Sequence, residues 1–222
     1  MNLVKLSLIC AACVPLVTVA QEELSTQKQK LSYAVGVNMA QRLKQTIEVD
    51  VDALTAALRD VLVGEGSRLS AEEIQSTLDE ERRRIELMQA DIAQKTKQAG
   101  EAFLTENAAK EGVMKTESGL QYKVIEAGEG ASPGPEDTVV VHYRGTLVNG
   151  DEFDSSYKRN TPATFPVNGV IPGWQEGLQL MKVGSKYNFY IPSELAYGPN
   201  GAGGAIGPNE TLIFEVELQE IK

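Results

Sequence analysis

The amino-acid pattern changes near residue 112, and this change limits the folds that the chain can adopt. From about 24 to 112 the chain has few aromatic residues, no proline and only isolated glycines. After 112 it is rich in glycine, proline, valine and aromatic residues, and apolar residues often alternate with polar ones. Three- and four-residue spacing predicts helices, whereas alternation between turn residues predicts strands. We therefore expect an α+β chain, helical first and built of strands afterwards.

Two short helices are expected in the first half. Residues 31–43 place an apolar side chain at every fourth position, so one face of a helix is apolar. Residues 52–64 carry a second apolar face that ends at Gly64, a residue typical of helix ends.

A much longer helix should follow. Ser70 and Glu73 form a capping-box pattern, and only Gly100 then interrupts the helical pattern before Gly112. A helix of about 40 residues spans about 60 Å and suggests a spacer or an oligomerisation element. Its second half, residues 93–112, is largely polar, and we expect it to be solvated. The apolar parts before it predict an intermolecular contact, with a self-contained three-helix bundle as the alternative.

The first twenty residues are typical of a secretory signal. Lys5 precedes an apolar run that ends at Ala20, where the sequence switches abruptly to Gln-Glu-Glu. The run is shorter than the roughly 20 apolar residues that cross a bilayer, which leaves an uncleaved interfacial anchor as the alternative. We expect cleavage after Ala20.

Both cysteines, Cys10 and Cys13, lie in this segment, so the mature chain would contain neither disulfides nor thiol chemistry. The net charge of −10 becomes one unit more negative when Lys5 is removed. An acidic surface disfavours nucleic acid and anionic membranes as partners.

The strands of the second half show which face is apolar. Val139, Val141 and Tyr143 fall on one face of a strand, and Val140, His142 and Arg144 fall on the other. In 211–218 the inward face carries Leu212, Phe214, Val216 and Leu218. Asn149-Gly150-Asp151 predicts a turn between two strands. An antiparallel sheet with one apolar face needs a cover, and the short helical segment 174–181 is the candidate.

The residue inventory excludes several kinds of catalysis. His142 is the chain's only histidine and lies within a predicted strand, so we predict no metal site and no serine-hydrolase triad. The glycine-rich stretch 198–207 lacks the Gly-Lys-Ser/Thr ending of a phosphate loop and precedes a strand, so we expect a flexible flap.

An aromatic set drawn from separate segments remains. Its members are Tyr143, Phe153, Phe165, Trp174, Tyr197 and Phe214. Composition favours an ordinary hydrophobic core. The alternative is an apolar cleft with a few polar anchors, as in small-ligand and peptide sites. Spacing alone leaves both open.

Three long motifs resemble one known family. The stretches VVVHYRGTLVNGDEFDSSY, FPVNGVIPGWQEGLQLMKVGSKYNFYIPSELAYG and TLIFEVELQEI resemble the FKBP-type peptidyl-prolyl isomerase domain, over about residues 112–222. The first half resembles the dimerising arm of the macrophage infectivity potentiator and related periplasmic foldases. The resemblance implies three parts: a signal peptide (1–20), a helical dimerisation domain with a long linker helix (21–111) and the isomerase domain (112–222).

The resemblance also implies a fold and an activity. The expected fold is a twisted antiparallel half-barrel covered by a short helix. The expected activity is prolyl cis-trans isomerisation (rotamase activity) without a cofactor, on unfolded or partly folded proline-containing proteins, with chaperone activity. The alternative is a holdase with incidental turnover. The resemblance further implies a homodimer formed through the N-terminal helices and inhibition by immunosuppressant macrolides. It also implies a periplasmic or outer-surface location in a Gram-negative bacterium.

Carried over by motif, the pocket has a floor, walls and a polar rim. Trp174 would form the floor, and the Ile171 amide would bind a substrate carbonyl. The expected catalytic residues are Asp154, Tyr197, Trp174 and Phe153. The expected substrate-binding residues are Tyr143, Phe153, Asp154, Phe165, Val170, Ile171, Trp174, Tyr197, Ile206 and Phe214. The chain departs from well-known small members at Ala163 and Ala202, where those have phenylalanine and histidine, and Phe165 is the substitute for the former.

Overall fold

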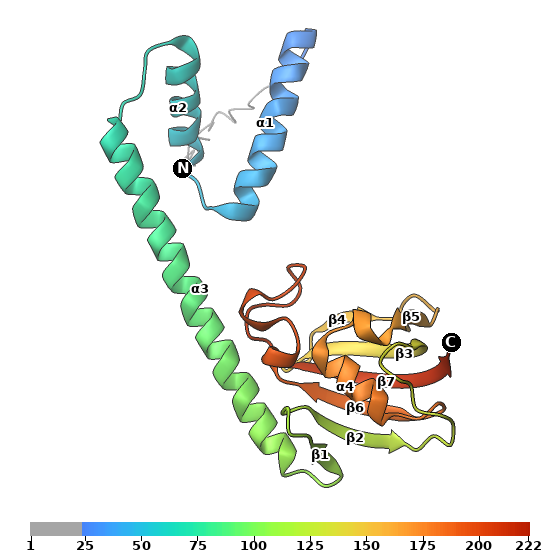
Figure 1. Cartoon of the computed structure of the whole chain (residues 1–222). Helices are drawn as coiled ribbons and strands as arrows, with labels where there is room; N and C mark the ends of the chain where they lie inside the picture. Colours follow the sequence, from blue (N-terminus) through green and yellow to red (C-terminus); the bar gives the residue numbers. More distant parts are fainter. Residues whose placement is uncertain (1–23) are drawn as a thin grey trace, which may run out of the picture. The chain divides into compact units, whose positions relative to one another are not determined.

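The computed structural model describes residues 24–222, so the expected signal segment lies outside the described residues (Figure 1). The chain divides into two compact units, one ending at Glu72 and the other spanning Glu73–Lys222. Within the described residues, no helix combines the length and the apolar character that a membrane span requires.

The first unit contains the two predicted short helices, α1 (Gln27–Thr46) and α2 (Val51–Val63). Thr26 begins α1 through a capping box with Gln29, and the Asp50 side chain caps α2 by accepting from the Ala53 amide at 2.8 Å. Gly64 ends α2 in the left-handed conformation, with φ of +89°, as its position predicted.

The apolar faces of these two helices are exposed. Leu31 is 63% exposed, Met39 42% and Leu62 82%. The buried hydrophobic cluster of the described chain contains only residues between 120 and 218. Residues 24–72 therefore form no buried hydrophobic cluster of their own, unlike a self-contained bundle.

The long predicted helix is present as α3 (Ala71–Ala108), and most residues of its second half are exposed as expected, but one face of this half packs on the sheet. Gly100 and Asn107 are buried in it. The Asn107 side-chain amide donates to Gln121 Oε1 at 3.0 Å, and the rings of Phe103 and Tyr190 lie 6.0 Å apart. The packed face was not expected, because a polar residue such as Asn107 can be buried only when its hydrogen bonds are satisfied.

A seven-stranded antiparallel sheet forms most of the second unit. Its strands are β1 (Val113–Lys115), β2 (Gln121–Glu126), β3 (Thr138–Leu147), β4 (Glu152–Ser155), β5 (Ala163–Pro166), β6 (Lys186–Ile191) and β7 (Leu212–Ile221). Their order is β1-β2-β6-β7-β3-β4, and β5 also pairs with β3. The sheet stays open, and the predicted turn at Gly150 joins β3 to β4 with φ of +92°.

The predicted alternation along the central strands is confirmed. Val139, Val141 and Tyr143 of β3 are buried, whereas Arg144 is exposed. In β7 the side chains of Phe214 and its alternate neighbours are buried in the same way. One face of the sheet is therefore continuous apolar surface.

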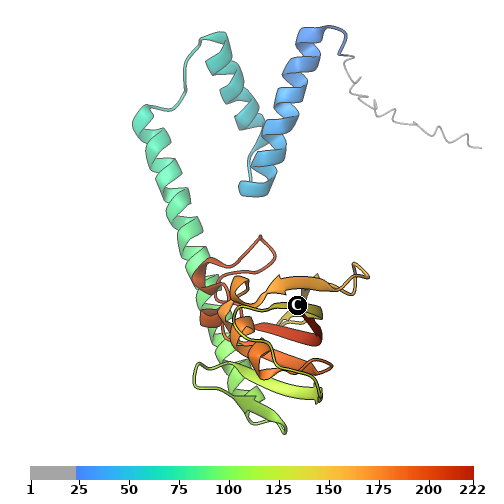
Figure 2. The same ribbon diagram turned by 45° about the vertical axis from the view of Figure 1, so that its right-hand side comes forward.

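The covering helix is α4 (Pro172–Leu180), which crosses the apolar face of the sheet (Figures 1 and 2). Two glycines allow α4 to approach the sheet closely. A Cβ atom on Gly173 would lie 2.4 Å from Ile191 Cγ2, and one on Gly177 would lie 2.8 Å from the Phe189 ring. The backbone of α4 therefore lies directly against β6, and Trp174 is turned toward the sheet.

The second half of α3 covers the opposite face. Gln121 is paired with Tyr190, and Tyr122 with Phe189, so Gln121 and Phe189 lie on opposite faces of the sheet. Phe189 faces α4, whereas Gln121 and Tyr190 contact α3. The second unit, here called the strand unit, thus consists of the sheet with α4 on one face and the second half of α3 on the other.

Candidate active site

The floor of a pocket is formed by Trp174 in the first turn of α4. The side chain is 3% exposed and lies edge-on to three rings, with centroid distances of 5.1 Å to Phe214, 5.4 Å to Tyr143 and 5.9 Å to Phe165. Such T-shaped pairs are the preferred arrangement of aromatic rings. The indole is therefore held in one orientation by rings from three different strands.

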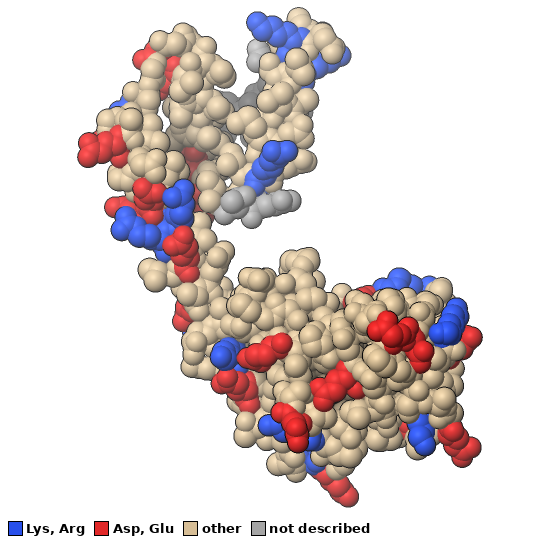
Figure 3. Space-filling view, in the orientation of Figure 1, with Lys and Arg blue, Asp and Glu red and all other residues tan. Residues whose placement is uncertain are grey.

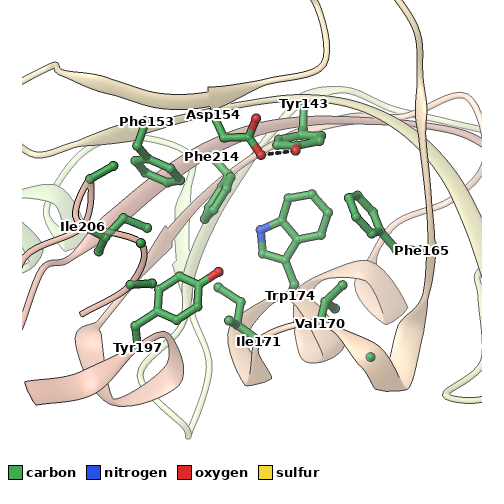
Figure 4. A pocket seen from close by; sticks show the side chains of 14 residues that line it. Tyr143, Phe153, Asp154, Phe165, Val170, Ile171, Trp174, Tyr197, Ile206 and Phe214 are labelled. Atoms are coloured by element: carbon green, nitrogen blue, oxygen red, sulfur yellow. Dashed lines mark hydrogen bonds between the residues drawn. The ribbon is translucent and has the colours of Figure 1, made fainter. Parts of the chain in front are cut away.

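A cavity of about 670 Å³ lies against this floor, within the size range of small-ligand sites (Figure 4). It lies between α4, the sheet and the loop that precedes β7. All ten substrate-binding residues expected from the sequence line it: Tyr143, Phe153, Asp154, Phe165, Val170, Ile171, Trp174, Tyr197, Ile206 and Phe214. Four further lining residues, Gly169, Ala202, Gly203 and Ala205, were not in that set.

Core and cleft are therefore not exclusive descriptions of the aromatic set. Tyr143, Trp174 and Phe214 belong to the buried core and also line the cavity. Phe165 lines the cavity as well, whereas Ala163 packs against the core without lining it. The ring of Phe165 thus contributes aromatic surface two residues after Ala163, the position for which the resemblance implied a phenylalanine.

Polar groups at the edge of the cavity are few. Among the described residues, nothing accepts a hydrogen bond from the Ile171 amide, although the Ile171 carbonyl accepts from the amides of Trp174 and Gln175 at 2.9 and 3.0 Å. The Gln175 side chain donates to the Val170 carbonyl at 2.7 Å and holds this turn in place. The free amide is therefore available to a bound carbonyl group.

Tyr197 and Trp174 supply two further donors. Tyr197 is 41% exposed, and its hydroxyl points toward the space enclosed by the aromatic rings (Figure 4). Trp174 Nε1 is buried, and no acceptor within residues 24–222 bonds it. The cavity is therefore mainly apolar, with a small number of donors, and its lining residues include no serine, threonine, cysteine, lysine or histidine.

Asp154 is bound in a network at the pocket edge. It accepts hydrogen bonds from the Tyr143 hydroxyl, from Arg159 Nη1 at 2.5 Å and from the Ser155 amide at 2.8 Å. Arg159 Nη2 also donates to the Tyr143 hydroxyl at 2.9 Å. Tyr143 and Asp154 are thereby fixed relative to each other, and Tyr143 in turn contacts Trp174.

The network sets the protonation of its members. Burial by itself would raise the pKa of Asp154, but the hydrogen bonds from Tyr143 and Arg159 and the Arg159 charge lower this pKa below its ordinary value. Burial, followed by the hydrogen bond to Asp154, raises the pKa of Tyr143. At neutral pH Asp154 is a carboxylate and Tyr143 a phenol, so neither is suited to exchange protons with a substrate.

Arg159 is the residue that the sequence reasoning missed. Its signal in the sequence is weak, because it lies five residues after Asp154 in a turn that contains several polar residues. Only the fold of this turn brings the guanidinium onto the carboxylate.

His142 and Ser156 are close to each other but do not form a catalytic pair. His142 Nδ1 lies 2.9 Å from Ser156 Oγ, and the imidazole stacks on Tyr157 with a centroid distance of 4.7 Å. Ser156 is fully buried, and its hydroxyl also accepts from the Tyr143 amide at 2.8 Å. A substrate cannot reach this oxygen. Within residues 24–222 no cluster of His, Cys, Asp or Glu could hold a metal ion.

The glycine-rich loop before β7 forms a narrow turn and contributes one wall of the cavity. Ala202 and Ile206 exchange two backbone hydrogen bonds of 2.9 and 3.0 Å. Gly201 has φ of +62°, and a Cβ atom there would lie 2.2 Å from the Ile206 carbonyl oxygen, so only glycine fits. This turn places Ile206, 8% exposed, in the cavity wall.

Comparison with known proteins identifies two matching families. Residues 129–219 match the family described as FKBP-type peptidyl-prolyl cis-trans isomerase, and residues 28–124 match the domain amino terminal to FKBP-type peptidyl-prolyl isomerase. The outer membrane protein MIP of Legionella longbeachae is 44% identical over 204 residues, which cover 90% of this chain and 88% of that protein. The FKBP-type 22 kDa peptidyl-prolyl cis-trans isomerase of Escherichia coli is 46% identical over 198 residues, covering 88% of this chain and 96% of that protein.

Solved structures show the same architecture. The crystal structure of FkpA from Escherichia coli aligns with a TM-score of 0.66 at 39% identity and covers 90% of this chain and 99% of that chain. A peptidyl-prolyl cis-trans isomerase from Pseudomonas syringae pv. tomato aligns with a TM-score of 0.55 at 36% identity, covering 58% of this chain and 95% of that chain. With matches of this identity over most of its length, the chain belongs to the family of FKBP-type peptidyl-prolyl cis-trans isomerases.

Proposed function

We propose that this isomerase accelerates rotation about Xaa-Pro bonds in exported proteins as they fold, and that the aromatic cavity is its catalytic site. The observation that carries the proposal is an apolar cavity floored by Trp174 with the unbonded Ile171 amide at its edge. Uncatalysed isomerisation takes about 10 to 100 s at 25 °C, which is slow enough to limit folding.

The chemistry requires no nucleophile and no cofactor. The barrier to rotation, about 18 to 20 kcal/mol, arises because amide resonance is lost when the bond twists. The twisted amide has less charge separation than the planar amide, so an apolar cavity disfavours the planar ground state more. The cavity therefore binds the twisted form more tightly, which is the condition for catalysis.

Each donor has a role in this scheme. The Ile171 amide binds a carbonyl next to the proline and fixes the direction of the chain. The proline ring lies over Trp174, between the walls that Phe153 and Phe214 provide, and the Tyr197 hydroxyl binds a second carbonyl. Asp154 acts through the network with Tyr143 and Arg159, which holds the wall beside the twisting bond, and not as an acid or base.

The test is a cis-to-trans assay on short Xaa-Pro peptides with wild type, Asp154→Ala and Tyr197→Phe. We expect clear acceleration by the wild type and reduced turnover in both variants. A wild-type rate equal to the spontaneous rate would refute the proposed function. His142→Ala serves as the matched control, because His142 is outside the cavity lining and its loss should leave turnover unchanged.

We propose that the helical arm forms a homodimer. In the division expected from the sequence this arm comprises residues 21–111. Support comes from the exposed apolar side chains of α1 and α2, and Figure 3 shows that most of their visible surface is uncharged. Covering such a surface with a second copy would remove apolar area from water. Sedimentation should give a dimer at micromolar concentration, and a monomer under those conditions would contradict this part of the proposal.

The same exposed surface favours a second function, binding of unfolded clients as a holdase. An aggregation assay separates this activity from turnover when wild type is compared with Trp174→Leu. Equal protection by both proteins would assign client binding to a surface outside the cavity. Loss of protection in the variant would assign it to the isomerase pocket.

Location and inhibition are the remaining parts of the proposal. The expected signal segment supports export to the periplasm or outer surface of a Gram-negative bacterium, and fractionation of cells that express the full chain tests it. The cavity size and its ring of aromatic side chains support binding of immunosuppressant macrolides. We expect such a compound to inhibit peptide turnover by the wild type, and we expect Trp174→Leu to lose this inhibition.

A further inference from the structure

The loop of residues 198–210, here called the flap, forms one wall of the cavity through Ile206 and follows Tyr197 directly. Its two ends are joined, because the Asn209 amide donates to the Gly198 carbonyl at 2.9 Å. Asn209 has φ of +59°, a left-handed conformation that asparagine adopts more readily than most residues. The position of Asn209 therefore sets the position of the whole flap.

Helix α3 holds Asn209 from outside the cavity. The Asn209 side-chain amide donates to the Ala93 carbonyl at 3.2 Å, although the two residues lie 116 positions apart in the sequence. This hydrogen bond joins the long helix to the base of the flap, and none of its atoms lines the cavity.

A second contact lies two residues further along the chain. Gly100 of α3 packs so closely on Thr211 that a Cβ atom on Gly100 would lie 2.4 Å from Thr211 Oγ1. Gly100 is buried, and Thr211 is 4% exposed. The absence of a side chain at Gly100 thus lets the helix approach the point where the flap enters β7.

These contacts belong to one face of the helix. Ala93, Gly100 and Asn107 are spaced by seven residues, which is nearly two helical turns, so they lie in one row. Asn107 is hydrogen-bonded to Gln121 in β2, and the Gln121 side chain donates back to the Leu104 carbonyl at 2.8 Å. The row is therefore fixed to the sheet at one end and to the flap at the other.

We propose that this row on α3 is a positioning element of the isomerase site, and that Asn209 is the positioning residue through which it acts. The inference rests on the proposed function. Without the bond to Ala93 the flap loses its external support, and Ile206 no longer keeps its place in the wall. Because this wall contacts planar and twisted substrate alike, the loss should raise KM more than it lowers kcat.

Two substitutions of Asn209 test the role of its side chain. Asn209→Asp keeps the shape but removes the donor, and Asn209→Gly keeps the left-handed backbone and the bond to Gly198. For both we expect KM on a blocked tetrapeptide with one Xaa-Pro bond to rise about three- to tenfold, the effect of one lost hydrogen bond. We expect kcat to stay within about twofold. Lys95→Ala, an exposed α3 position, is the control that should leave KM unchanged.

Complementary changes in side-chain size at Gly100 and Thr211 test the role of α3 itself. Gly100→Ala improves helix propensity, so it should not weaken α3, but its methyl group would collide with Thr211 and displace the helix from the flap. We expect KM to rise in Gly100→Ala and to return toward the wild-type value in the double variant Gly100→Ala/Thr211→Ala. This rescue separates a positioning role from general damage to the fold.

The outcomes are distinguishable. A wild-type protein without catalysis refutes the proposed function itself. An active wild type with unchanged KM in Asn209→Asp, Asn209→Gly and Gly100→Ala overturns the positioning role. It is also overturned if kcat falls at constant KM in proportion to the unfolded fraction measured by circular dichroism, because that result indicates lost folded protein.

Discussion

Replacement of Trp174 by leucine tests whether one ring serves both the core and the catalytic floor. The indole is 3% exposed and makes three edge-to-face contacts, with Phe214, Tyr143 and Phe165. Each such pair contributes about 0.5 to 1.5 kcal/mol beyond burial, and truncation of a buried tryptophan to alanine costs about 3 to 5 kcal/mol. Leucine retains part of the apolar volume, so we expect the free energy of unfolding to fall by about 2 to 4 kcal/mol.

The loss should be measurable without abolishing the fold. Domains are stable by about 5 to 15 kcal/mol, so most of the variant should remain folded in water. With a urea m-value of about 1 to 3 kcal/mol/M, the midpoint should shift by about 0.7 to 4 M. Near-ultraviolet circular dichroism is the appropriate probe, because only Tyr33 among the seven tyrosines lies before residue 112.

Turnover should fall in the same variant under conditions where it is folded. Leucine cannot reproduce the flat indole surface beneath the proline ring, so kcat/KM on a tetrapeptide should fall well beyond the unfolded fraction. A variant with an unchanged urea midpoint would refute the role of Trp174 in the core. A variant with wild-type kcat/KM would refute its role as the catalytic floor.

Three further expectations concern single groups. Asp154→Asn should lower turnover and leave the urea midpoint nearly unchanged, because the side chain is 42% exposed. The folded-state pKa of Asp154 is lowered, so its small stabilising contribution is present above the unfolded pKa of about 3.9 and is lost as pH falls through the folded value. The small stability difference between wild type and Asp154→Asn should therefore be constant above about pH 5 and shrink below about pH 4. Gly173→Ala should destabilise the strand unit by about 1 to 3 kcal/mol in urea unfolding, because its Cβ atom would lie 2.4 Å from Ile191; a wild-type midpoint would show that α4 can move away from β6 at little cost. Raising the pH from 7 to 9 should leave turnover unchanged, since the Tyr143 hydroxyl stays protonated, and a loss of activity in this range would contradict that assignment.

Local patterns predicted the elements of this fold well. The break at Gly64, the turn at Gly150 and the inward face of β7 all follow from residue type and spacing within a few positions. Alternation reports the buried face of a strand because successive side chains point to opposite sides. In the structure, the ten residues that the resemblance implied for substrate binding all line one cavity, and their roles in binding stay predictions.

The same local reasoning missed the packed face in the second half of α3, most of which is exposed as expected. A polar stretch suggested solvent, but Asn107 finds a buried partner in Gln121, fourteen residues later in the sequence. Hydrophobicity patterns cannot predict such a pair, because burial of a polar side chain depends on the partner that the fold supplies. Arg159 escaped notice for the same reason, since its bond to Asp154 depends on the shape of one turn.

The sequence alone established the helical and strand halves and the covering segment at Trp174, because these depend on residue types and on short spacings. The tertiary structure decided that the aromatic set encloses a cavity as well as a core, that the Ile171 amide is left free, and that α3 reaches the flap through Asn209. These features join residues from distant parts of the chain. Their geometry exists only once α4, the sheet and α3 have packed together.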